Sequence, residues 1–61
     1  MTISEKIDRA LSQHENNKYP ERSLESIAHY IDWAWKWKKI SRPEMMNFVE
    51  RICVLFERER Q

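Results

Sequence analysis

The residues best suited to bind a metal or to act as catalysts are His14, His29 and Cys53. A closed zinc site needs four protein ligands, and these three are all the histidine and cysteine that the sequence holds. Neither histidine has a second one four residues away, and no base adjoins the cysteine. We therefore expect no metal, no cofactor and no catalytic residue. His14 is expected to favour the dipole at a helix C-terminus, and Cys53 to be a small buried hydrophobic residue.

The acidic residues that stand out have structural explanations. Glu44 follows Ser41 at capping-box spacing, and Asp32 precedes Lys36 by four residues, which favours an ion pair on a helix. The chain has 61 residues and no glycine, which disfavours phosphate-binding loops and dinucleotide-binding turns. So short a chain has little room for a preorganised cleft. We expect that the protein is not an enzyme.

One cluster of positive charge suggests contact with nucleic acid. It is interleaved with Trp35 and Trp37, and it consists of Lys36, Lys38, Lys39 and Arg42. Basic groups contact phosphates, and aromatic rings stack on bases. The net charge of the whole chain is only +1, however, whereas dedicated nucleic-acid binders usually carry a larger excess. A helix-turn-helix-like DNA-binding regulator that uses this patch at 36–42 is therefore the alternative prediction for function.

Composition indicates a folded helical protein. The hydrophobic share of 41% and the aromatic share of 11% are too high for a disordered chain. No run of 18 apolar residues exists, and MTISEKID lacks the apolar core of a signal peptide. With a single cysteine, these features predict a cytoplasmic protein that does not bind a membrane.

Two breaks divide residues 1–61 into three helical segments of a single small domain. The first is expected from Ile3 to His14 or Glu15, with Thr2 and Glu5 at capping-box spacing. Asn residues at 16 and 17 can end it, since asparagine tolerates the left-handed conformation. The second is expected to start between 20 and 23 and to reach about residue 39. The third should run from 42 or 43 to 57 or beyond, after a break at 40–44 that contains Pro43.

The second segment is apolar on two opposite faces. One face carries Leu24, Ile27, Ala28, Ile31, Ala34 and Trp35, and the opposite one carries Tyr30, Trp33, Trp37 and Ile40. A helix of this kind must be covered on both sides. The third segment has an apolar face that spans roughly half its circumference, wider than one helix partner requires. Its centre is formed by Met45, Phe48, Val49, Ile52, Leu55 and Phe56, with Met46 and Cys53 at its edge.

These surplus apolar faces predict self-association. Burying one tryptophan is worth on the order of 4–6 kcal/mol as an upper bound, and a small domain has little other stabilisation. We expect an all-α fold, a helix hairpin plus an N-terminal helix, in an intertwined homodimer. The expected dimer or partner interface comprises Tyr30, Trp33, Trp35, Trp37, Ile40, Phe48, Ile52 and Phe56.

Residues 31–37 allow a second interpretation. Ile31, Trp33, Trp35 and Trp37 also alternate with a period of two, and aromatic residues favour strands. A short strand between subunits is therefore the alternative to a helix in this segment.

Three segments resemble a known group of proteins. ISEKIDRALSQHENN, SIAHYIDWAWKWKKIS and MMNFVERI are similar to a small early-region protein of lambda-like temperate bacteriophages, encoded between the exonuclease and excisionase genes. The resemblance implies a small, helical, dimeric accessory protein in the host cytoplasm that favours lytic development through host or phage proteins. It carries over no functional residue. Together with the absence of site chemistry, it predicts a non-enzymatic interaction protein whose partner is a host or phage protein.

Overall fold

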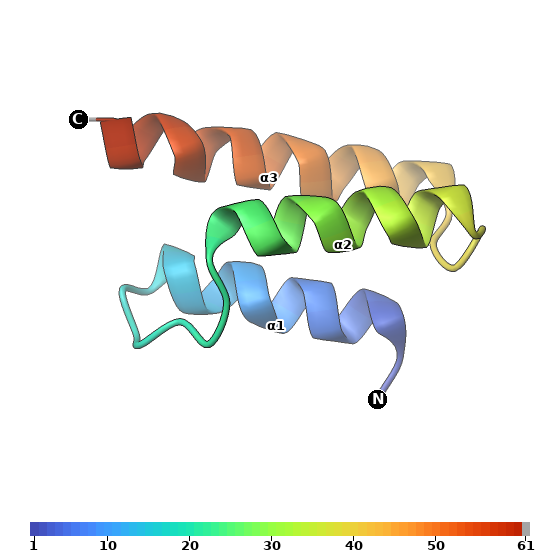
Figure 1. Ribbon diagram of the computed structural model, residues 1–61, viewed down its shortest axis with the longest axis horizontal. Coiled ribbons are helices and arrows are strands. Elements are labelled where there is room, and N and C mark those ends of the chain that lie inside the picture. The colour runs from blue at the N-terminus through green and yellow to red at the C-terminus, as the bar shows by residue number, and fades with distance from the viewer. Residues whose placement is uncertain (61) are drawn as a thin grey trace.

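The structure is a computed structural model that describes residues 1–60, and it is all-helical, as predicted. Helix α1 spans Ile3–Glu15, α2 spans Leu24–Lys36 and α3 spans Arg42–Arg60 (Figure 1). The described part of the chain contains no strand. Residues 31–36 belong to α2, so the alternative of a strand at 31–37 is wrong. The hydrophobic pairs at three- and four-residue spacing outweigh the shorter alternating pattern.

Side-chain caps fix where the helices begin. The backbone N–H of Glu5 donates to Thr2 Oγ1 at 3.1 Å, which begins α1 as predicted. Ser23 caps α2 by accepting from the N–H of Ser26 at 3.2 Å. At α3 the capping box is reciprocal, because Ser41 N–H donates to Glu44 Oε1 at 3.0 Å and Glu44 N–H donates to Ser41 Oγ at 3.4 Å.

Both turns begin with a residue in the left-handed conformation, although neither is glycine. Asn17 has φ 53° and Lys38 has φ 56°. After α2, Lys39 N–H donates to the carbonyl of Ala34 at 2.7 Å and Lys38 N–H to that of Trp35 at 3.1 Å, the two bonds of a Schellman motif. This motif ends α2 at Lys36 rather than near 39. Asn17 ends α1 in the same way, which confirms the role predicted for its asparagines.

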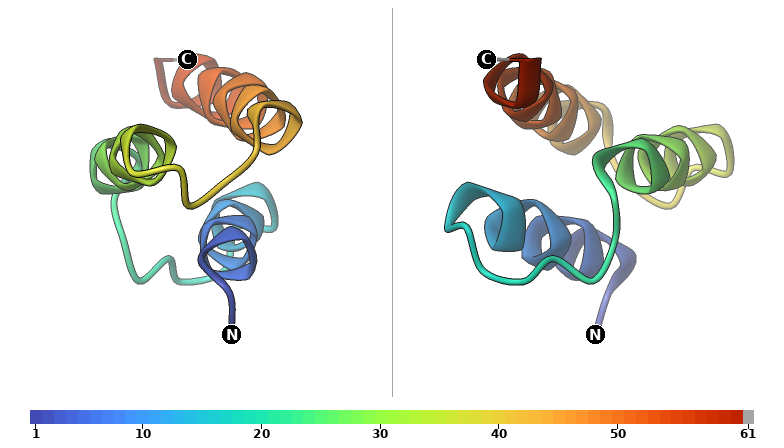
Figure 2. Two further views of the ribbon diagram at one scale, coloured as in Figure 1. Left: turned by 90° about the vertical axis from the view of Figure 1, so that its right-hand side faces the viewer. Right: turned by 60° about the vertical axis from the view of Figure 1, so that its left-hand side comes forward.

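The three helices form a bundle that measures 33 × 21 × 16 Å. Seen end-on they occupy the corners of a triangle, and each helix contacts both others (Figure 2). α1 and α3 run in the same direction, and α2 runs against both. The buried core between them consists of Ile7, Leu11, Leu24, Ile27, Ile31, Ala34, Ile40, Phe48, Ile52 and Leu55.

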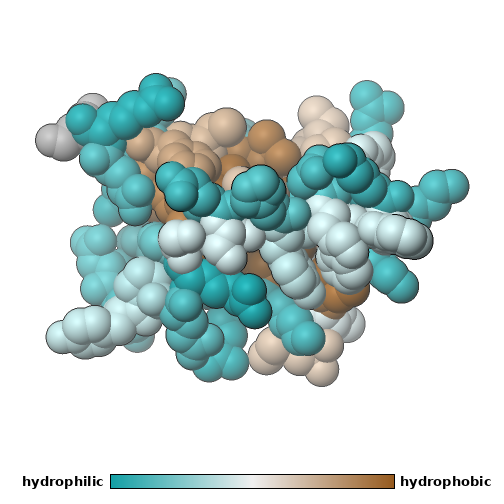
Figure 3. Space-filling view, viewed as in Figure 1, coloured by the Kyte–Doolittle hydropathy of each residue, from teal (hydrophilic) through white to brown (hydrophobic). Residues whose placement is uncertain are grey.

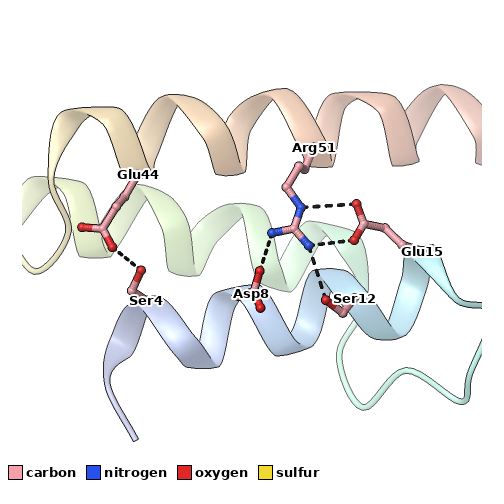
Figure 4. A network of polar contacts seen from close by, with 6 residues as sticks. All are labelled: Ser4, Asp8, Ser12, Glu15, Glu44 and Arg51. Atoms are coloured by element: carbon pink, nitrogen blue, oxygen red, sulfur yellow. Dashed lines mark hydrogen bonds and ion pairs between the residues drawn. The ribbon is translucent and has the colours of Figure 1, made fainter.

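A network around Arg51 joins α1 to α3 (Figure 4). Its guanidinium donates to both carboxylate oxygens of Glu15, at 3.2 and 2.7 Å, and to Asp8 at 2.6 Å. The hydrogen bond from Arg51 lowers the pKa of Glu15, and the same bond raises that of Arg51. At the start of both helices, Ser4 donates to Glu44. Because these contacts join matching levels of two parallel helices, they fix the register of α1 against α3.

Candidate functional site

The tryptophans lie at the surface of the bundle. Trp33 is 41% exposed, Trp35 40% and Trp37 67%. Tyr30 and Phe56 are half-buried. Three other members of the expected interface, Ile40, Phe48 and Ile52, lie in the core of the single chain. Ile40 reaches that core because the turn at Lys38 ends the helix before it and redirects the chain.

The exposed tryptophans do not share one face of α2. Trp33 and Trp35 are two residues apart, which separates them by about 200° around a helix. Trp33 lies on the flank of Tyr30, and the two rings are 5.5 Å apart. Tyr30 lines a cavity with residues of α1, so this flank is directed towards α1. Trp35 lies on the other side of the buried stripe of α2, on the flank towards α3.

α3 also has two unlike flanks. Glu44 and Arg51 contact α1, which identifies the flank that faces it. On the opposite flank, towards α2, lie apolar residues that the core does not fully cover. We call this surface, together with Trp35, the α2–α3 apolar face: Trp35, Met45, Met46, Val49, Cys53 and Phe56. Figure 3 shows an apolar band along α3, bordered by a hydrophilic row along α2.

The structure corrects the prediction for Cys53 and places His14 where it was expected. Cys53 is exposed rather than buried, because the contact with α2 covers only part of the wide apolar face of α3. His14 does lie in the last turn of α1, and its ring also has a partner across the turn. Its Nε2 lies 2.6 Å from the carbonyl oxygen of Arg22, and a carbonyl only accepts, so Nε2 carries the proton.

The four basic residues gather around the turn between α2 and α3. Lys36, Lys38, Lys39 and Arg42 are all exposed. Lys36 forms the predicted ion pair with Asp32 at 3.0 Å, and the other three make no ion pair with the described residues. All four basic residues and Trp37 are therefore exposed at or next to this one turn.

Sequence reasoning missed the role of Arg51, which binds two carboxylates of α1. No local pattern signals its partners, because Asp8 and Glu15 are about forty residues away in the chain. Only the parallel alignment of α1 and α3 brings them together.

Residues 1–60 contain neither a metal-binding cluster nor a membrane-spanning helix. No three side chains among the histidines, cysteines and acidic residues lie close enough to hold a metal ion. In the same range no helix is both long and apolar enough to cross a membrane.

The fold thus defines a small three-helix bundle with exposed aromatic side chains. In comparisons with protein-family models, with curated proteins and with solved structures, no match to this chain was found. The resemblance to the bacteriophage group is therefore neither supported nor opposed by them, and it stays a prediction.

Proposed function

We propose that the protein is a non-enzymatic interaction protein that forms a homodimer through the α2–α3 apolar face. The observation that carries the proposal is the exposure of apolar side chains along one flank of α3, next to Trp35. The largest exposed apolar patch of a small protein is often functional, and an interaction with another protein is one such function.

Trp35 is the largest side chain of the α2–α3 apolar face. At about 150–250 Å² for a tryptophan, an exposed share of 40% leaves roughly 60–100 Å² for Trp35. Met46 is 57% exposed and Val49 40%, and Cys53 is also exposed, so α3 adds to the exposed apolar area of Trp35. A standard interface covers about 800 Å² on each partner, and somewhat over half of it is apolar. The α2–α3 apolar face would form the apolar part of such an interface, and polar neighbours such as Asp32 and Lys36 would form the rim.

A second copy suits this surface for two further reasons. A chain of this length buries only about 60% of the surface of its unfolded form, so association adds stabilisation that one copy lacks. The net charge of +1 also opposes the approach of two copies very little. A dimer made by joining like faces is the commonest symmetric assembly.

Two valines of α3 provide a matched test. Val49 lies in the α2–α3 apolar face and is 40% exposed, whereas Val54 lies outside it and is 52% exposed. We expect the unaltered chain to have twice the mass of one chain by light scattering across a concentration series. Val49→Lys should give a monomer, because a dimer would bury its charge. Val54→Lys should leave the dimer intact.

A second measurement guards against misfolding of the variant. Circular dichroism should show the same helix content for both lysine variants. Cys53 is the sole cysteine, so its reaction with a thiol reagent reports on this face. The thiol should react slowly in the dimer and quickly in Val49→Lys. A monomeric unaltered chain, or equal effects of the two substitutions, would refute the proposed dimer.

For the biological setting, we propose an early accessory role in a lambda-like bacteriophage, in which the dimer favours lytic development by binding a host or phage protein. The support is the resemblance of the three segments named above. The test is the frequency of lysogens when a temperate phage infects cells that produce the protein. Production should lower this frequency, and a dimer-deficient Val49→Lys should not. An unchanged frequency with the unaltered protein would count against this role.

The alternative of a helix-turn-helix-like DNA reader has weaker support. A recognition helix needs a polar and mainly basic outer face. The outward residues of α3 include Glu50 and Glu57, and Arg51 is held by Asp8 and Glu15. A gel-shift assay at low salt with Lys38→Glu checks this alternative, which requires a complex that the variant loses.

A further inference from the structure

A cavity of about 300 Å³ lies between α1, the turn before α2 and the first half of α2. This volume is at the lower end of the range of small-molecule sites. Its apolar lining includes Met1, Ala10 and Tyr30, together with Ile7 and Ile27, which are almost fully buried and add little exposed surface. The cavity is on the α1 flank of α2, so it is separate from the α2–α3 apolar face.

Positive charge dominates the polar part of the lining. Lys6, Arg9 and Arg22 line the cavity, against a single carboxylate, that of Glu21. None of the three cations forms an ion pair with another residue in the part of the chain that the structure describes. Lys6, Arg9 and Gln13 recur at helical spacing, so one stripe of α1 presents them together.

The rim of the cavity is held in place by side chains. Gln13 Oε1 accepts from the backbone N–H of Glu21 at 3.3 Å, and His14 donates to the carbonyl of Arg22. The Arg22 guanidinium lies 5.9 Å from the centre of the Tyr30 ring, within the range of a cation–π contact. A stacked guanidinium still has its N–H edges free to bind an oxyanion. The site is therefore partly organised without a ligand.

We propose that this cavity binds a small aromatic anion. The ring of the ligand lies against Tyr30 and the apolar walls, and its carboxylate is held by Lys6, Arg9 and Arg22. The lining selects for an aromatic ring and for a negative charge together. A neutral aromatic compound leaves the cations without a partner, and a simple anion leaves the apolar walls uncovered.

The probe is 3-phenylpropionate, followed by amide chemical shifts in nuclear magnetic resonance spectra of the full chain. We expect saturable shifts at the residues that line the cavity, with a dissociation constant on the order of 1–10 mM for so small a ligand. The uncharged 3-phenylpropionamide and the ringless acetate should each bind at least about threefold more weakly. Equal binding of either compound, or shifts centred on Trp35 instead, would overturn the proposal.

Charge-removing variants distinguish binding in the cavity from general attraction of the anion to the basic surface. Arg9→Gln and Arg22→Gln each remove one cation at an exposed position, and each should weaken binding about three- to tenfold. Arg42→Gln changes the net charge equally but lies outside the cavity, so it should leave binding unchanged. Three equal effects would contradict the proposed site. This test does not depend on the dimer, because Val49→Lys should bind the probe as the unaltered chain does.

An aromatic carboxylate occurs both in free organic acids and at the end of a polypeptide. Acetyl-Ala-Phe, with a free C-terminal carboxylate, distinguishes these two sources. Tighter binding than that of 3-phenylpropionate would assign the site to the C-terminus of a partner protein. Weaker binding would assign it to a free acid, and no binding by either probe would refute the proposal.

Discussion

Trp33 and Trp35 are separated by one residue and are almost equally exposed, yet they lie on opposite flanks of α2. Trp33 lies beside Tyr30 on the α1 side, with the two rings tilted by 39°, whereas the helical spacing puts Trp35 on the flank towards α3. A helix that is apolar on two sides thus gives this bundle two different surfaces. Each surface has its own consequences for association and binding.

The two tryptophans are expected to differ in their effect on the dimer. Trp35→Ala should raise the dimer dissociation constant at least about tenfold, because buried tryptophans are frequent energetic centres of interfaces. Trp33→Ala removes the same side chain outside the proposed face and should change the constant by less than about threefold. Sedimentation equilibrium measures both. Equal losses would place the interface elsewhere on α2.

Leu11 tests the core of the single chain. It is fully buried between the helices, so Leu11→Ala should lower the free energy of unfolding by about 2–5 kcal/mol. Val54→Ala, at an exposed position of α3, should change it by no more than about 0.5 kcal/mol. Urea unfolding at one fixed protein concentration measures both, since dimerisation makes stability depend on concentration. A small effect of Leu11→Ala would mean that α1 is not part of the folded core.

Arg51 is expected to contribute to stability through its shape as well as its charge. Arg51→Ala should lower the free energy of unfolding by about 1–2 kcal/mol. An arginine that binds two carboxylates contributes more to stability than an isolated ion pair at the surface. Arg51→Lys keeps the charge but cannot donate to both oxygens of Glu15 in the same way, so it should restore only part of the loss. Full restoration would show that charge alone matters.

Stability should fall in acid. The pKa of Glu15 is lowered by its bond to Arg51, and the pKa of Glu44 is lowered by Ser4 and then Ser41. A lowered pKa in the folded state means that the stabilisation is complete above the ordinary value of 4.5 and is lost as the pH falls below it. Urea unfolding from pH 7 to pH 3 measures this loss.

Two glutamine variants identify the groups responsible for that loss. Glu15→Gln should lower stability at pH 7 and flatten the decline below pH 4.5, because the titrating carboxylate is gone. Glu25→Gln, on the exposed surface of α2, should leave the decline unchanged. A decline of the same size in Glu15→Gln would show that other groups cause it.

The turn after α2 should gain from a glycine. Lys38 has φ 56°, a conformation that disfavours residues with a Cβ atom. Lys38→Gly should raise the free energy of unfolding by about 0.5–1 kcal/mol, the relief of strain less the added flexibility of the unfolded chain. Lys39→Gly makes the same change at a position without positive φ and should lower it. Thermal unfolding measures the stability of both variants. Lower stability in both would show that Lys38 is not strained.

Local signals in the sequence predicted the helices well. Thr2, Ser41 and Glu44 marked two helix starts by capping chemistry that involves only neighbouring residues. The end of α2 was less evident, because a lysine rather than a glycine takes the left-handed position. A capping pair can be recognised from its residue types and spacing, whereas a lysine in a left-handed turn position has no such pattern.

The exposed apolar surfaces were harder to predict than the helices. They depend on which flank of each helix packs against the other two. Helical periodicity placed Ile40 with Trp33 and Trp37, but the turn moved Ile40 into the core. The wide apolar face of α3 was evident from the sequence, whereas the share that α2 covers was not. Cys53 was therefore expected to be buried, and it is exposed.

The connections between helices also bear on how quickly the chain folds. Only residues 16–23 and 37–41 separate successive helices, and each helix lies beside the next. Most contacts therefore join segments that are close along the chain, which gives a low contact order. Helical bundles of this topology fold in microseconds to milliseconds. The single chain should thus reach its native arrangement long before it meets a second copy at ordinary cellular concentrations.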